Sequence, residues 1–173
     1  MGKVAPSQRE RAHAGIIMKH LRLSRSLATL ALTGALSVTM LGAAIDGVTT
    51  ADSDFAHQAM TMLLQSVANA DPAQSNGSAD VKALASKVQT DEIGIGKQLA
   101  SLANYYGINV STTAAKPSTD ASGYAADQAK SLESLITIFE NEAQNGGGAQ
   151  LRSFASASLP TLQADLKAVQ AQT

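Results

Sequence analysis

Apolar and small residues recur along the chain in steps of four and three, the spacing that places side chains on one face of an α-helix. We call each such row of positions an inward seam. The longest seam is unbroken and comprises Val81, Ala85, Val88, Glu92, Ile95, Leu99, Leu102 and Tyr106. Gly107 then predicts a left-handed helix cap, with Ile108 as the apolar residue that follows it.

Three further segments repeat this pattern. The first of these helices is predicted to begin at residue 54, where Asp52, Ser53 and Asp54 offer N-cap oxygens. It should end at Asp71-Pro72, because the residue before a proline avoids the helical conformation. The third opens near Tyr124 and closes at the QNGGG stretch, and the fourth begins near Ala149. No stretch alternates with period two for long enough to form a strand, so the sequence predicts an all-α four-helix bundle.

The segment before the bundle has the order of a secretory signal peptide. A basic stretch, MKHLRLSRS, precedes an uncharged apolar run, LATLALTGALSVTMLGAA, which ends in small residues. We therefore predict a signal peptide over residues 1–44 that is cleaved near Ala44, a lead-in over 45–53 and the bundle domain over 54–173. Met18 offers an alternative start, which would make residues 1–17 superfluous. A retained membrane anchor is the alternative to cleavage, since the run is nearly long enough to span a bilayer.

Charge and composition narrow the function further. Residues 45–173 carry seven basic and thirteen acidic side chains, a balance that disfavours nucleic acid and anionic lipid as partners. The chain has no cysteine, which excludes disulfides, thiolate chemistry and lipid acylation on cysteine. We expect a periplasmic or secreted protein without a membrane span once the signal has been removed.

Three stretches, VKALASKVQTDE, GYAADQAKSLESLITIFENEA and LRSFASASLPTLQADL, resemble an exported bacterial family known as domain of unknown function 4142. The likeness covers about residues 54–170. It implies a ferritin-like four-helix fold, location in the cell envelope with outer-membrane association, and an envelope protein as the class of partner. In this family pattern, helix one carries a Glu and each other helix a His, at the positions held here by Ser66, Glu92, Leu132 and Asp165.

Those same four positions lie on the inward seams. After residue 44 the only histidine is His57, and residues 45–173 contain no Glu-x-x-His, so a di-iron centre is poorly supported. One divalent metal held by Glu92, Asp165, Asp91 and Ser66 is an alternative, because hard cations accept all-oxygen ligands. Otherwise Glu92 and Asp165 reach solvent, face one another, or pair with a lysine, for which the candidates are Lys97, Lys130 and Lys167.

Gly94 and Gly96 interrupt the same seam, and a mid-helix glycine costs about 1 kcal/mol relative to alanine. They indicate either an opened helix beside the acidic positions or the close approach of a neighbouring segment. The sequence shows no catalytic motif, and we identify no catalytic residue and no organic cofactor. The expected function is a non-enzymatic envelope protein acting through binding or structure, with a metal-binding or metal-dependent protein as the alternative.

Overall fold

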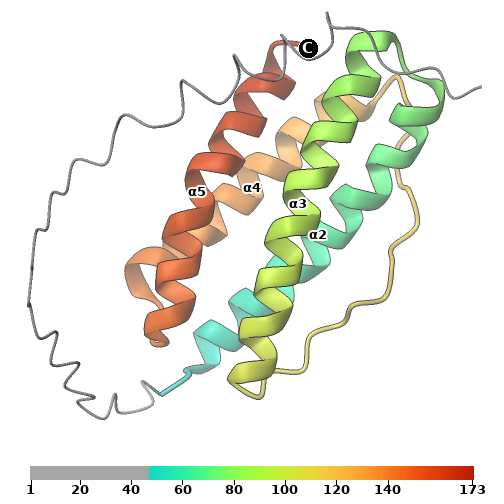
Figure 1. Cartoon of the computed structure of the whole chain (residues 1–173). Helices are drawn as coiled ribbons and strands as arrows, with labels where there is room; N and C mark the ends of the chain where they lie inside the picture. The colour runs from blue at the N-terminus through green and yellow to red at the C-terminus, as the bar shows by residue number, and fades with distance from the viewer. Residues whose placement is uncertain (1–46) are drawn as a thin grey trace, which may run out of the picture. The chain divides into compact units, whose positions relative to one another are not determined.

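The computed structural model describes residues 47–173, which fold into four α-helices (Figure 1). They are α2 (Thr50–Asn76), α3 (Ala79–Tyr105), α4 (Tyr124–Asn145) and α5 (Ala149–Gln170). The predicted all-α four-helix bundle is thus confirmed. The predicted signal peptide lies outside the described residues. Over the described part of the chain, no helix is long and apolar enough to cross a membrane.

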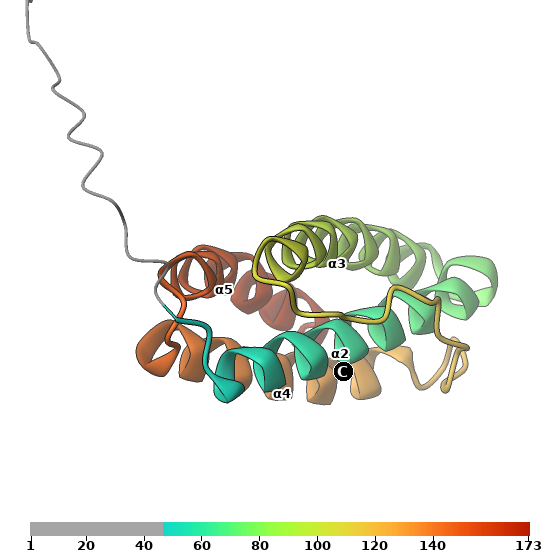
Figure 2. The ribbon, with the colours of Figure 1, turned by 90° about the horizontal axis from the view of Figure 1, so that it is seen from below.

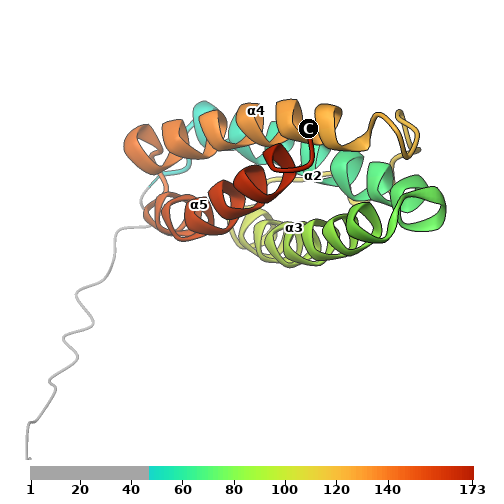
Figure 3. The same ribbon diagram turned by 90° about the horizontal axis from the view of Figure 1, so that it is seen from above.

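The helices are arranged as two hairpins. α2 packs most closely with α3, and α4 with α5, while α2 also touches α4 and α3 touches α5 (Figures 2 and 3). The connection between α3 and α4 runs along α2: His57 Nε2 lies 3.1 Å from the Asn109 carbonyl oxygen, and Asn69 Oδ1 accepts from Ser118 N–H at 2.8 Å. This connection returns the chain to the end of the bundle where α3 began, so α3 and α4 run in the same direction (Figure 1).

The first helix begins earlier than the sequence predicted. Thr49, not Asp52 or a later residue, is the N-cap, and Asp52 completes a capping box from the third helical position. The Thr49 hydroxyl accepts from Asp52 N–H at 3.2 Å, and the Asp52 carboxylate accepts from Thr49 N–H at 2.6 Å. The reciprocal bonds satisfy two donors at the helix start, which moves that start to Thr50.

The predicted end of this helix at Asp71-Pro72 is wrong, because α2 continues through Pro72 to Asn76. Ala73 is buried with Ala70, Ala85 and Tyr124 in a small cluster, and Gly77 N–H closes the last turn on the Ala73 carbonyl at 2.9 Å. Packing of the last turn offsets the hydrogen bond that proline removes. Ser78 then caps α3 by accepting from Val81 N–H at 3.3 Å.

The predicted cap at the end of α3 is confirmed. Gly107 has φ 73°, a left-handed conformation that suits glycine. Its N–H reaches the Asn104 carbonyl at 3.1 Å, and Ile108 N–H reaches the Ala103 carbonyl at 2.8 Å. These two bonds make a Schellman motif, and the Ile108 side chain is buried as the motif requires.

Three phenylalanines hold the centre of the hydrophobic core. The Phe139 ring centroid lies 5.1 Å from that of Phe55 in an edge-on contact and 5.7 Å from that of Phe154. Leu132, which the sequence places on an inward seam, is fully buried, and so is Phe139 on the same face of α4. The seams therefore identified the faces on which the four helices pack.

Candidate functional site

Each helix contributes one buried polar side chain to a layer across the bundle interior. We call it the polar layer, and it consists of Ser66 on α2, Glu92 on α3, Gln128 on α4 and Asp165 on α5. Ser66, Glu92 and Asp165 are buried, as their places on the inward seams predicted. Buried polar groups need partners, so the bonds within the layer decide what it can do.

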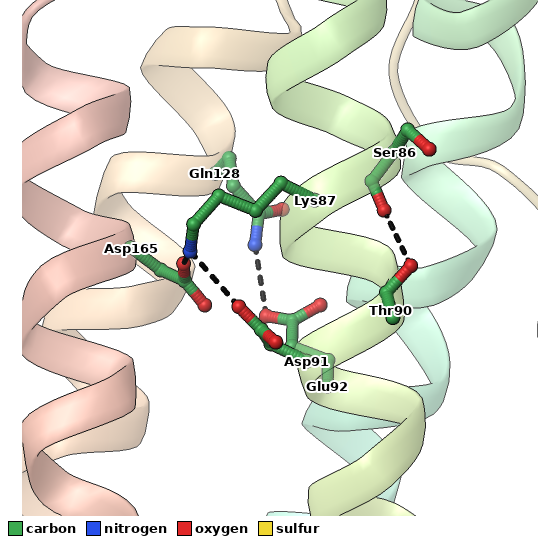
Figure 4. A network of polar contacts seen from close by, with 7 residues as sticks. All are labelled: Ser86, Lys87, Thr90, Asp91, Glu92, Gln128 and Asp165. Atoms are coloured by element: carbon green, nitrogen blue, oxygen red, sulfur yellow. Dashed lines mark hydrogen bonds and ion pairs between the residues drawn. The ribbon is translucent and has the colours of Figure 1, made fainter. Parts of the chain in front are cut away.

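Glu92 is bound by two neutral side chains. The Ser66 hydroxyl donates to its Oε2 at 2.5 Å. Gln128 Nε2 donates to its Oε1 at 2.9 Å (Figure 4). Gln128 Nε2 also lies 2.5 Å from the Ser66 oxygen. Burial raises the pKa of Glu92 to about 8, and the negative charges of Asp165 and Asp91 add to the rise. Glu92 is therefore mostly protonated at pH 7.

Asp165 has a different kind of partner. Its Oδ1 is ion-paired with the Lys87 ammonium, which also reaches Asp91 Oδ2 at 2.9 Å (Figure 4). Burial raises the pKa of Asp165, although the hydrogen bond and charge of Lys87 act in the opposite direction. The lysine candidates Lys97, Lys130 and Lys167 were wrong for this role, because Lys87 reaches across from α3 instead. Glu92 and Asp165 thus have separate partners.

The residues proposed as metal ligands fall into two groups. Ser66 binds Glu92, whereas Asp91 and Asp165 share Lys87. Within residues 47–173, no three His, Cys, Asp or Glu side chains are placed to hold a metal ion. Asp165 Oδ2 and Gln128 Oε1 are buried without a hydrogen-bond partner, as is the hydroxyl of Tyr124. Burial raises the pKa of Tyr124, which keeps this hydroxyl neutral.

A pocket of about 190 Å³ opens between α2 and α3 beside the polar layer. Its walls are largely apolar, and one of them includes Ile93, which is 38% exposed although it is a large aliphatic side chain. Gly96 lines the pocket and Gly94 does not. A Cβ atom on either glycine would meet nothing within 4 Å, so the interpretation that a neighbouring segment approaches their backbone is wrong.

The sequence matches the family described as "Domain of unknown function (DUF4142)" over residues 37–171. The chain belongs to the DUF4142 family. No curated protein and no solved structure matches the chain. This family match carries no assigned activity.

Sequence reasoning missed two members of the site in this DUF4142 chain. Gln128 lies four residues before Leu132 and so on the same face of α4, but the seam was followed through the neighbouring Ala129 instead. Leu132, one of the positions where the family resemblance places a histidine, is a core residue. Lys87 could not be found in this way, because its exposed side chain crosses to a helix 78 positions further along the sequence.

A second buried polar cluster of the DUF4142 bundle lies where α2 begins and α4 turns into α5. We call it the end clasp, and it consists of Thr49, Asp52, Glu142, Gly147 and Gly148. Asp52 accepts four hydrogen bonds: from Thr49 N–H and O–H at 2.6 and 2.7 Å, and from the N–H groups of Gly147 and Gly148 at 2.8 and 3.2 Å. Burial alone would raise its pKa, but these bonds lower the pKa of Asp52 to about 2.

Glu142 is the second carboxyl group of the end clasp. Burial and the adjacent negative charge of Asp52 raise the pKa of Glu142 to about 7. Its Oε1 is buried without a hydrogen-bond partner. A Cβ on Gly147 would lie 2.5 Å from Thr49 Cγ2 and 2.9 Å from Asp52 Oδ2, so the clasp requires glycine there. Asp52 had been predicted only as a helix cap, and Glu142 had not been identified.

Proposed function

We propose that this chain is an exported cell-envelope protein that acts by binding a small, largely apolar molecule and not by catalysis. The observation that supports the proposal is the pocket between α2 and α3. It has about the size of a small-molecule cavity and apolar walls that include Met60, Leu63 and Ile93. An engineered cavity of about 150 Å³ with similar walls takes up benzene.

The state of the polar layer favours binding over catalysis. A catalytic acid or base must reach the reacting atoms of its substrate. Glu92 is only 1% exposed, and both of its oxygens are engaged by Ser66 and Gln128. A neutral, hydrogen-bonded carboxyl group in this position suits the wall of a pocket.

The connectivity supports a ferritin-like arrangement, which we also propose. Two antiparallel hairpins joined by one long crossover are the connectivity of ferritin-like bundles. The segment that follows Tyr106 and runs along α2 is such a crossover (Figure 1). In such an arrangement the polar layer would be the counterpart of the interior layer that holds metal ligands in di-iron bundles.

Export rests on the basic, apolar and small-residue order of residues 18–44. Intact-mass spectrometry of the protein recovered from cell fractions tests it. We expect a first residue near 45 and a soluble envelope or secreted fraction. An intact N-terminus in the membrane fraction would show a retained anchor instead.

Binding at the pocket is tested with benzene as a neutral probe, followed through methyl resonances in NMR spectra. We expect saturable shifts for Met60, Leu63 and Ile93, which line the pocket. The methyl groups of Leu151 and Val169 lie outside that lining and are the internal control. Shifts of equal size at all five residues would show non-specific partitioning and contradict the proposal.

A divalent cation is the second candidate, and one observation favours it. Asp165 Oδ2 and Gln128 Oε1 are buried, lack hydrogen-bond partners and are oxygens of the kind that hard cations accept. Elemental analysis of the purified protein, with and without added Mn, Fe or Zn, tests this candidate. Bound metal that disappears in Asp165→Asn would support it, and equal metal content in both proteins would contradict it.

A further inference from the structure

The packing of the helices does not explain why position 96 of α3 is a glycine. Glycine is less favourable than alanine within a helix, so a helical glycine indicates a position where a side chain would be harmful. No neighbouring atom excludes a side chain here, because a Cβ on Gly96 would meet nothing within 4 Å. Gly96 lines the pocket, and any side chain there would project from the pocket wall. The missing side chain keeps the pocket open, whereas nothing in the structure explains Gly94.

Charge at the pocket indicates what it receives. Lys97 follows Gly96, lines the same pocket and is exposed. The ion pairs found among residues 47–173 both involve Lys87, so Lys97 has no carboxylate partner there. Glu92, the acidic group of the lining, is buried and bound to neutral side chains. The pocket thus offers an unpaired cation beside apolar walls and no exposed anion to oppose it.

We propose that the pocket binds a small aliphatic carboxylate. Its hydrocarbon chain would lie against Met60, Leu63 and Ile93, and its carboxylate beside the Lys97 ammonium. A volume of about 190 Å³ suits a chain of about six carbons, since about 150 Å³ accommodates benzene. This inference rests on the proposed binding function and adds the chemical class of the ligand.

Three probes of equal chain length test the class of ligand: hexanoate, hexan-1-ol and hexylammonium. Each is titrated into the full chain, as recovered from cells, at pH 7, and the methyl resonances of Leu63 and Ile93 are followed by NMR. An exposed ion pair is worth up to about 1 kcal/mol, so we expect hexanoate to bind about threefold to fivefold more tightly than hexan-1-ol. Hexylammonium should bind most weakly. Lys97→Gln should abolish the preference for hexanoate and leave the affinity for hexan-1-ol unchanged.

Matched glycine variants test the pocket itself. Gly96→Leu should abolish binding of all three probes, and Gly96→Ala should weaken it partially. Gly94→Leu makes the same change on the same helix outside the pocket and should leave binding intact. Leucine forms helix better than glycine, so both leucine variants should melt at or above the wild-type temperature. If Gly96→Leu fails to fold, Gly96→Ala alone decides whether filling the pocket weakens binding.

The outcomes separate the ligand class from the proposed function. Binding of hexan-1-ol as tight as that of hexanoate would overturn the carboxylate and leave the binding function standing. Failure of all three probes to bind would overturn both. Undiminished binding in both Gly96→Ala and Gly96→Leu would show that the probes bind elsewhere.

Discussion

Asp52 in the end clasp and Glu92 in the polar layer are buried to the same degree, with exposures of 0% and 1%. The pKa of Asp52 is lowered to about 2, whereas that of Glu92 is raised to about 8. Burial favours the protonated form of both groups, and more strongly for Glu92, which lies in the middle of α3 and not at a helix end, so burial explains part of the difference. The rest of the explanation lies in what each carboxyl group contacts.

The donors around the two groups differ in number and kind. Asp52 accepts four hydrogen bonds, three of them from backbone N–H groups, and lies in the first turn of α2. The N-terminus of a helix stabilises negative charge. Glu92 accepts from two side chains in the middle of α3 and has Asp165 and Asp91 as negative neighbours. Fixed donors and helix ends, together with the depth of burial, therefore decide which interior carboxyl groups of this protein are charged.

Glu142 shows the same rule within the end clasp. It lies in the last turn of α4, where the helix dipole disfavours a carboxylate, and next to the ionised Asp52. The two carboxyl groups are adjacent, but Asp52 lies at the N-terminus of a helix and Glu142 at the C-terminus of another. Asp52 is therefore charged, whereas Glu142 keeps its proton below about pH 7. The clasp thereby joins the start of α2 to the turn between α4 and α5.

Removing Asp52 should have the largest effect on stability. Asp52→Ala leaves the N–H groups of Gly147 and Gly148 and both donors of Thr49 without their acceptor. We expect a loss of about 3–5 kcal/mol in the free energy of unfolding at pH 7, measured by urea denaturation. Asp54→Ala, at an exposed position two residues further along α2, is the control and should change stability by less than about 0.5 kcal/mol. Equal losses in the two variants would show that the clasp does not hold the fold.

Glu142→Gln should remove a pH-dependent contribution of roughly 3 kcal/mol to the free energy of unfolding, which corresponds to a pKa raised from 4.5 to about 7. The folded state holds the proton more tightly than the unfolded state. Wild-type stability should therefore fall as pH rises from about 4.5 to about 7 and level off above that. Glutamine mimics the protonated form, so the variant should match wild type near pH 5 and be more stable near pH 8.

The control for this prediction is Glu140→Gln, an exposed change on the same helix. Urea denaturation of wild type and both variants is measured at intervals from pH 5 to pH 8. The prediction concerns the difference between variant and wild type, because Glu92 titrates in an overlapping range. A difference for Glu142→Gln that stays constant across the series would mean that Glu142 is not the group that titrates.

Lys87→Met tests the charged half of the polar layer. Breaking a buried ion pair from one side typically costs about 3–5 kcal/mol, but Lys87 is 53% exposed and screened by water. We therefore expect a loss of about 1–3 kcal/mol at pH 7. Lys82→Met is an exposed control on the same helix. Adding Asp165→Asn to Lys87→Met should restore part of the loss, and no recovery would show that the Asp165 charge is not the cause.

The sequence predicted the helices better than their ends. Steps of four and three identified all four packing faces, and Gly107 with Ile108 predicted the Schellman motif, because these signals are local. The end at Pro72 was wrong because burial of Ala73 against Tyr124 is a tertiary contact that proline chemistry does not reveal. The predicted start of α2 was wrong because the Asp52 carboxylate accepts from Thr49 N–H and from the glycine turn after α4, and so Asp52 lies inside the helix and is not its N-cap.

The site was predictable to the same extent. Ser66, Glu92 and Asp165 followed from the seams, since helical spacing fixes which positions face inward. Which of them are charged did not follow, because this depends on Lys87 and Gln128, whose partners lie on other helices. The pocket beside Gly96 was not predicted: the sequence suggested an opened helix or a close neighbouring segment there, whereas α3 is continuous and nothing approaches the glycine.

Glu92→Gln should have the smallest effect at low pH, although it changes a fully buried side chain. Below its pKa of about 8, Glu92 is protonated, so glutamine replaces one neutral group by another of the same shape. We expect a change of less than about 1 kcal/mol at pH 5. As pH rises from about 4.5 to about 8, wild type loses stability because the folded state retains the proton, and the variant should become the more stable protein. Thermal melts of both proteins across this range, each with and without chelator, make the measurement. Destabilisation by Glu92→Gln at every pH, together with a chelator effect on wild type alone, would show a bound metal and contradict a neutral Glu92.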